Sequence, residues 1–156
     1  MKLLSQNHVK YGLIMCAVVI LCLFYMELTG QNESFEKSPL VAFWTFIAPA
    51  IVWFFGIRAR KIAQKNKLTF KQGATEGFKI SVVFAVTSPF IFLLYYLLVN
   101  PQILGYVRKA YGLTTADEAV VIVVDLLVQV VSAIIFGTLY GAIISFILKS
   151  RKAAAR

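Results

Sequence analysis

The sequence predicts an all-α, polytopic membrane protein with four transmembrane helices in an antiparallel bundle and a long cytoplasmic hairpin between the second and third helices. Four long stretches carry no charged residue, at 11–26, 38–57, 80–99 and 126–148. In addition, 60% of the 156 residues are hydrophobic, which leaves too little polar surface for a soluble helical protein. Because a helix rises about 1.5 Å per residue, roughly 20 apolar residues cross the hydrocarbon core of a bilayer. We expect one membrane domain covering residues 1–156.

The first predicted helix covers about 9–29. Its charge-free part is short, but the helix can extend past Lys10 and Glu27, because charged side chains near a helix end reach the interface. No small-x-small cleavage pattern follows it, so we expect this helix to remain as a membrane anchor. Cys16 and Cys22 are six residues apart on one helix and are not expected to pair.

The second predicted helix covers about 39–65. Asn66 is the expected stop, since asparagine tolerates the left-handed conformation that ends many helices. The turn to the next helix is then limited to Lys67 and Leu68. Pro49 lies about ten residues into the helix and should kink it, because proline removes one backbone hydrogen bond.

The third predicted helix covers about 70–99. Thr69 followed three residues later by Gln72 is a capping-box pattern, which predicts that the helix begins at Phe70. Pro89 lies at about the same depth as the proline of the second helix and should kink this helix as well. Paired breaks at mid-membrane occur in transporter sites, but proline is also common in membrane helices, and the sequence favours this plainer interpretation.

The segment after the third helix is predicted to be short and amphipathic. Apolar residues recur at helical spacing over 101–111, which is typical of a helix lying on the outer leaflet. The fourth helix is predicted over about 116–149. Thr115 with Glu118 at the third position repeats the capping-box pattern, so this helix should also begin outside the hydrocarbon core.

The distribution of cations predicts which side each connection faces. Most of the 16 lysines and arginines lie near the two termini or between the second and third helices, whereas Lys37, Arg108 and Lys109 lie on the opposite side. Under the positive-inside rule both termini face the cytoplasm, in a multi-pass protein of the cytoplasmic (inner) membrane. The predicted cytoplasmic basic loop contains Arg58, Arg60, Lys61, Lys65, Lys67 and Lys71. Topology explains these cations, which would also suit anionic membrane lipid or an acidic protein.

Small residues recur every four positions in the third and fourth helices. They are Gly73, Gly77, Ser81 and Ala85 in the third helix, and Ala133, Gly137, Gly141 and Ser145 in the fourth. Small residues let helix backbones approach closely in lipid, where no hydrophobic force drives helices together. We expect the two helices to cross as antiparallel neighbours. A dimer face is the alternative use of the two glycines of the fourth helix, and the sequence favours the internal contact.

Asp125 is the one acid beside the last long apolar stretch. At about 1.5 Å per residue it lies some 36 Å from Lys149, beyond a hydrocarbon core roughly 30 Å thick, so we place it among the outer headgroups. Gln129, one turn deeper, is then the most buried strongly polar side chain and needs a partner on another helix. Asp125 and Gln129 form a candidate polar site, either structural or part of an ion path.

The chain lacks the residues that metal or nucleophile chemistry requires. His8 is the single histidine, so neither a histidine-based metal cluster nor a Ser-His-Asp triad can be assembled. We interpret Glu76 as a surface residue that pairs with Gln72 and Lys79 at helical spacing. The net charge of +9 is explained by the topology rather than by nucleic acid. We expect no enzyme activity, no cofactor, no metal and no nucleic-acid partner.

Three segments resemble a known family. They are FFGIRARK at 54–61, LTFKQGATEGFKI at 68–80 and FGTLYGAIISFILKSRK at 136–152. Together they give a Gly-Ile-Arg exit from the second helix, a Thr-Phe start to the third, and a small-residue final helix ending in lysines. In these features the sequence resembles domain-of-unknown-function family 4199 over nearly the whole chain. The resemblance implies a small bacterial four-helix membrane protein and implies no activity, because the motifs are not catalytic.

Two classes of function remain open. The first is a non-enzymatic interaction or accessory module that sits in membrane lipid and packs against another membrane protein or forms a homo-oligomer. It follows from the small-residue ridges and the lack of reactive clusters. The alternative is a small transporter or channel that uses the polar site near Asp125 and Gln129. A lipid-modifying enzyme is the weakest reading, since no reactive constellation is found.

Overall fold

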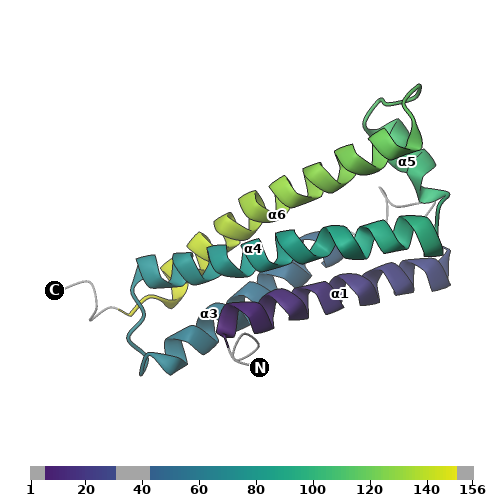
Figure 1. Ribbon diagram of the computed structural model, residues 1–156. Helices are drawn as coiled ribbons and strands as arrows, with labels where there is room; N and C mark the ends of the chain where they lie inside the picture. The colour runs from purple at the N-terminus through teal and green to yellow at the C-terminus, as the bar shows by residue number, and fades with distance from the viewer. Residues whose placement is uncertain (1–5, 31–42, 151–156) are drawn as a thin grey trace.

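The computed structural model describes residues 6–30 and 43–150, and every regular element in this part of the chain is helical. In chain order the elements are α1 (Asn7–Thr29), the π-helical segment η2 (Phe43–Ile47), α3 (Ala48–Ala63), α4 (Phe70–Leu94), the π-helical segment η3 (Tyr95–Val99), α5 (Ile103–Ala110) and α6 (Glu118–Leu148). Figure 1 shows α1, α3, α4 and α6 lying lengthwise along one another, with the short α5 at one end. The predicted all-α class is confirmed.

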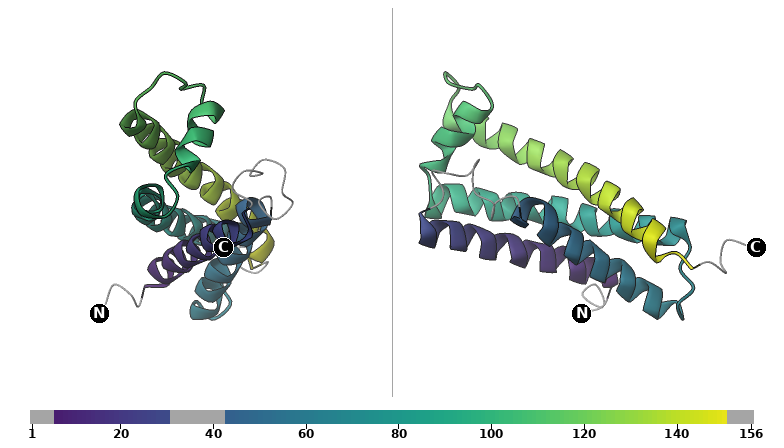
Figure 2. Two further views of the ribbon diagram at one scale, coloured as in Figure 1. Left: turned by 90° about the vertical axis from the view of Figure 1, so that its right-hand side faces the viewer. Right: turned by 180° about the vertical axis from the view of Figure 1, so that it is seen from behind.

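The long helices run in two directions. α1 and α4 run the same way, and α3 and α6 run the opposite way (Figures 1 and 2). The start of α1, the α3–α4 connection and the end of α6 therefore lie at one end of the bundle, which we call the connection end. α5 and the start of α6 lie at the other, which we call the α5 end. α6 lies against α4 near the connection end and diverges from it towards the α5 end.

Three helical stretches of the described residues are long and apolar enough to cross a membrane, namely Asn7–Thr29, Phe70–Val99 and Glu118–Leu148. The predicted second span does not appear as one such helix. Residues 39–42 lie outside the described residues, and the rest is divided into η2 and the 16-residue α3. Pro49 lies in the first turn of α3, directly after the π-helical η2, so the regular α-helical pattern is interrupted next to the proline. Pro89 lies inside α4, as predicted.

A local signal predicted from the sequence sets the start of α4. Thr69 and Gln72 form the predicted capping box, in which Gln72 N–H donates to Thr69 Oγ1 at 3.3 Å and Thr69 N–H donates to Gln72 Oε1 at 3.0 Å. This prediction is confirmed, because it depends on a few neighbouring residues. Asn66 adopts the expected left-handed conformation, with a φ of 62°, but it does not stop the helix, because α3 ends at Ala63 and Lys65 is already left-handed.

The turn between α3 and α4 is longer than the predicted pair of residues, since α3 already ends at Ala63. Leu68 is fully buried and is held by Ser150, two residues after α6. Ser150 N–H donates to the Leu68 carbonyl at 2.9 Å, and Leu68 N–H donates to Ser150 Oγ at 3.1 Å. Ser150 Oγ donates in turn to the Asn66 carbonyl at 2.5 Å. The end of α6 thus closes the turn, a contact that the hairpin sequence alone does not reveal.

The connection from α5 to α6 also differs from the prediction. Within the predicted segment 101–111 the helix α5 covers Ile103–Ala110, and its first two residues are buried against the rest of the protein. The predicted cap at Thr115 is wrong. Ala116 N–H donates to the Leu113 carbonyl at 3.1 Å, so Thr115 lies inside a turn and Asp117 is the residue before α6. Thr115 and Glu118 have the spacing of a capping box, but Thr115 belongs to the turn before α6 and therefore cannot cap the helix.

A close backbone contact joins α4 and α6 at Gly77 and Gly141. A Cβ atom added at Gly77 would lie 2.5 Å from Gly141 Cα, a separation that real Cβ atoms essentially never show. Trp53 of α3 covers this contact and is almost completely buried. Its indole N–H lies 3.2 Å from the Gly77 carbonyl oxygen and 3.3 Å from Ser81 Oγ. Three helices therefore meet at these two glycines.

The same seam continues on both sides of this contact. Gly73 lies against Ser145 towards the connection end, and Ser81 lies against Gly137 towards the α5 end. Of the remaining small residues, Ala85 is buried and Ala133 is half-buried. The structure thus places most of the predicted packing residues in a contact inside the chain rather than on a dimer face. We call this contact the glycine seam.

We predict that Gly77→Ala destabilises the folded protein by about 1–3 kcal/mol, the usual cost of overpacking. The new methyl group would meet the backbone of α6, which cannot rotate away as a side chain can. Thermal unfolding in detergent micelles measures the effect. Gly105→Ala on α5 is the matched control, because its Cβ would have no neighbour within 4 Å and alanine favours the helix. Equal stability of the two variants would contradict the role of the glycine seam.

Candidate functional site

Asp125 of α6 is buried at the α5 end, with 6% of its surface exposed, and accepts hydrogen bonds from three side chains. Tyr96 and Gln129 donate to its Oδ2 atom, and Tyr111 donates to its Oδ1 atom at 2.9 Å. Gln129 Nε2 also donates to the Tyr96 hydroxyl oxygen at 3.0 Å. We call these four residues the Asp125 cluster. The structure thus brings together the two residues predicted to form a polar site and adds two tyrosines.

The members of the Asp125 cluster come from three separate segments. Asp125 and Gln129 are one turn apart on α6, Tyr96 belongs to η3, and Tyr111 directly follows α5. η3 ends where Asn100 N–H donates back across five residues at 2.9 Å, which is the wide π-helical bond pattern. The chain then turns into α5, which folds back so that Tyr111 reaches the carboxylate from the other side. The site depends on this reversal.

The prediction that Gln129 is the most buried strongly polar side chain is wrong. Asp125 is buried inside the protein, whereas Gln129 is half-buried. The prediction measured depth along the helix axis and did not include the cover that α5 and η3 provide. Gln129 does find the expected partner outside α6, the Tyr96 hydroxyl. Its Oε1 atom is buried and has no hydrogen-bond partner among the described residues.

Neutral hydrogen-bond donors, rather than a cation, hold the Asp125 carboxylate. Within the described residues no lysine, arginine or histidine nitrogen lies within 4.0 Å of it. Burial, followed by the nearby carboxylate, raises the pKa of Tyr111 to about 12. Tyr111 therefore keeps its proton at physiological pH and remains a donor to Asp125. A carboxylate out of water needs such donors, because an unpaired buried charge is costly.

Glu76 forms a second buried polar cluster near the connection end. Only 4% of its surface is exposed, so its interpretation as a surface residue paired with lysine is wrong. Asn7 of α1 donates from Nδ2 to Glu76 Oε1 at 2.7 Å and to the Gly56 carbonyl oxygen at 2.9 Å. Arg60 Nε lies 3.9 Å from Glu76 Oε2, and His8 Nδ1 lies 3.8 Å from Oε1. The carboxylate thus connects α1, α3 and α4.

A sequence signal for the burial of Glu76 existed but was weak. It lies three residues after Gly73 and four before the fully buried Ile80, so it shares the packed side of α4. Tyr96 was harder to identify, because an aromatic residue near the end of a membrane helix is usually an interface anchor. Its partner is 29 residues away in sequence. No local pattern joins the two.

A third set of polar contacts ties the end of α1 to the end of α4. Tyr95 donates from its hydroxyl group to Glu27 Oε2 at 3.1 Å, and Asn100 donates from Nδ2 to the same oxygen at 3.0 Å. Glu27 is exposed, and its carboxylate links the end of α1 to η3 and to the residue that follows it. Among the described residues at the α5 end, Glu27 and Asp125 each accept a hydrogen bond from a tyrosine of η3.

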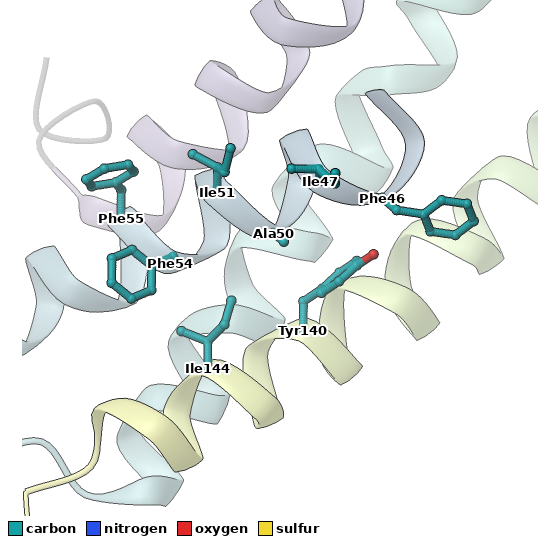
Figure 3. A pocket seen from close by; sticks show the side chains of 8 residues that line it. All are labelled: Phe46, Ile47, Ala50, Ile51, Phe54, Phe55, Tyr140 and Ile144. Atoms are coloured by element: carbon teal, nitrogen blue, oxygen red, sulfur yellow. The ribbon is translucent and has the colours of Figure 1, made fainter. Parts of the chain in front are cut away.

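An open apolar groove of about 540 Å³ runs between α3 and α6. It is lined by Phe46, Ile47, Ala50, Ile51, Phe54, Phe55, Tyr140 and Ile144. Figure 3 shows Ala50 and Phe54 facing Tyr140 and Ile144 across it. We call it the α3–α6 groove.

The predicted basic loop lies beyond one end of the α3–α6 groove, on the last turns of α3, the turn and the start of α4. Arg58, Arg60, Lys65, Lys67 and Lys71 are exposed, and Lys61 is half-buried. Arg60 is the one that faces Glu76.

The described residues contain no group of three or more histidine, cysteine, aspartate or glutamate side chains placed to hold a metal ion. Cys16 and Cys22 are both free thiols, as the spacing predicted. Cys16 Sγ lies 2.9 Å from Thr87 Oγ1, which joins α1 to α4 beside the predicted kink.

The long apolar helices indicate the class of protein. An all-α chain with three apolar helices of membrane-spanning length is consistent with a multi-pass membrane protein. Residues 10–150 match the family described as "Protein of unknown function (DUF4199)", so the chain belongs to this family, as its sequence motifs suggested. No curated protein and no solved structure matches the chain. The description of this family assigns no activity to its members.

We predict that Tyr96→Phe destabilises the protein by about 1–2 kcal/mol, because Asp125 loses a donor and Gln129 loses an acceptor in a buried site. Tyr106→Phe on α5 is the matched control. Tyr106 is 41% exposed and makes no hydrogen bond to the described residues, so its variant should unfold like the wild type. Thermal unfolding in micelles compares the two. If Tyr96→Phe left stability unchanged, the Asp125 cluster would not hold the α5 end together.

Proposed function

We propose that this protein is a four-span protein of the bacterial inner membrane with both termini in the cytoplasm, acting as a non-enzymatic interaction or accessory module. In this proposal η2 and α3, which together run from Phe43 to Ala63, belong to the second crossing along the chain, in addition to the three long apolar stretches. The start of α1 and the end of α6 lie at one end of the bundle, which supports an even number of crossings. The cations near that end favour a cytoplasmic location.

The exposure of α6 is the observation that carries the proposed role. Only 11% of its apolar window is buried inside the protein, compared with 22% for α1 and for residues 70–99. The same helix is fixed by the glycine seam and by the Asp125 cluster, so its uncovered side is a rigid apolar face. Val131, Ile135 and Leu139 are exposed on it. We propose that another transmembrane protein, or a second copy of this chain, packs on this face.

The alternative function is a small transporter or channel. The Asp125 cluster speaks against it, since the carboxylate and the amide nitrogen of Gln129 are engaged by partners inside the protein. One observation favours it, namely the Gln129 Oε1 atom that has no partner among the described residues. Solute flux in reconstituted vesicles that is lost in Asp125→Asn would favour transport over the module.

Reporter fusions test the proposed topology. We expect a fluorescent protein fused to either terminus to be active, because both termini would lie in the cytoplasm, and a phosphatase fused there to be inactive. A phosphatase inserted after Gly112, in the connection at the α5 end, should be active outside and serves as the control. Termini on opposite sides of the membrane would mean three crossings and would contradict the proposal.

Photocrosslinking in native membranes tests the proposed partner face. A photoreactive residue at Leu139 should give one discrete protein adduct, whose mass distinguishes a second copy from a different protein. Leu21 on α1 is the matched control, because it is at least as exposed but lies on another face of the bundle. If neither Leu139 nor Leu21 captured a protein, or if both captured protein equally, the result would count against a partner on α6.

A further inference from the structure

The apolar wall of the α3–α6 groove continues directly into cations at the connection end. On an α-helix, residues three, four and seven apart share a face. Arg58 lies three residues after Phe55, four after Phe54 and seven after Ile51, all of which line the groove. Lys61 lies seven after Phe54. The next turns of the lining face of α3 therefore present a guanidinium and an ammonium group at the mouth of the groove.

Within the part of the chain that the structure describes, these two cations have no carboxylate counter-ion. Among the described residues neither Arg58 nor Lys61 has a carboxylate oxygen within 4.0 Å. Glu76, the one acid between residues 37 and 116, is buried and engaged by Asn7, with Arg60 beside it. The mouth of the groove thus carries positive charge that an external anion would balance.

We propose that the α3–α6 groove is a binding site for an anionic phospholipid, with one acyl chain between α3 and α6 and the phosphate held by Arg58 and Lys61. The groove is apolar along its length and basic at one mouth, which is the pattern of an acyl chain and its headgroup. A second copy with the same orientation in the membrane would instead bring one basic end against another. The inference rests on the proposed placement in a bilayer, and it does not depend on the accessory role of the protein.

Native mass spectrometry from a neutral detergent tests the site, because it counts lipids that remain bound to each protein. The probes are phosphatidylglycerol and phosphatidylcholine with the same acyl chains. We expect a single phosphatidylglycerol adduct, binding about fivefold more weakly in Arg58→Gln, since one basic residue near anionic lipid accounts for roughly that factor. Arg58→Lys, which keeps the charge, should retain most of the binding. Ala50→Phe should also reduce it, because the new ring would fill the groove.

Lys71→Gln is the matched control, since it removes one exposed charge from the same end of the bundle but lies on α4, away from the groove. All variants are compared after their thermal unfolding has been shown to match that of the wild type. If Ala50→Phe does not meet this condition, Ile51→Trp is used to fill the groove from the same helix. The proposal is overturned if Lys71→Gln weakens binding as much as Arg58→Gln, or if phosphatidylcholine binds equally well. It is also overturned if the groove-filling variant binds normally, or if the protein appears as a lipid-free dimer.

Discussion

The backbone contact between Gly77 and Gly141 is the constraint on which the rest of the bundle depends. In lipid, apolar side chains gain little by leaving one apolar environment for another, so helices associate where their backbones can approach closely. The two glycines allow this approach, and Trp53 from α3 then packs across both helices and donates to the carbonyl that the contact exposes. Ser81 and Ser145 beside the seam donate back to carbonyls of their own helices at 2.9 and 2.5 Å, so small size is obtained without unsatisfied hydroxyl groups.

Because α6 is held closely at one point, its divergence from α4 leaves space at the α5 end that other groups fill. α5 and η3 occupy this space. Tyr96 of η3 and Tyr111, which follows α5, surround the Asp125 carboxylate. A buried carboxylate is destabilising unless donors surround it, so the cluster holds the α5 end in place only while all three partners are present. The divergence of α6 from α4 makes room for the Asp125 cluster, and the Asp125 cluster fills the space that the divergence leaves.

The sequence reveals those features of the fold that depend on neighbouring residues. The capping box at Thr69 and the ridge that contains Gly77 were identified because each is a short pattern with a direct physical reason. The burial of Asp125 and Glu76 was missed, because it depends on cover from segments that lie far away in sequence. Pro49 shows the same limit, since a proline predicts an interruption of the helix but does not predict that a π-helical segment precedes it.

The polar contacts of the two buried carboxylates lie away from the α3–α6 groove. Glu76 binds α1 and α3 to α4 near the connection end, and Asp125 binds α6 to η3 and to the residue after α5 at the other end. α3 and α6 contact each other through Trp53 at the glycine seam, and phenylalanine, isoleucine and tyrosine side chains line the groove beside this contact. Because neither carboxylate lines the groove, the surface that it offers to an acyl chain is mainly apolar.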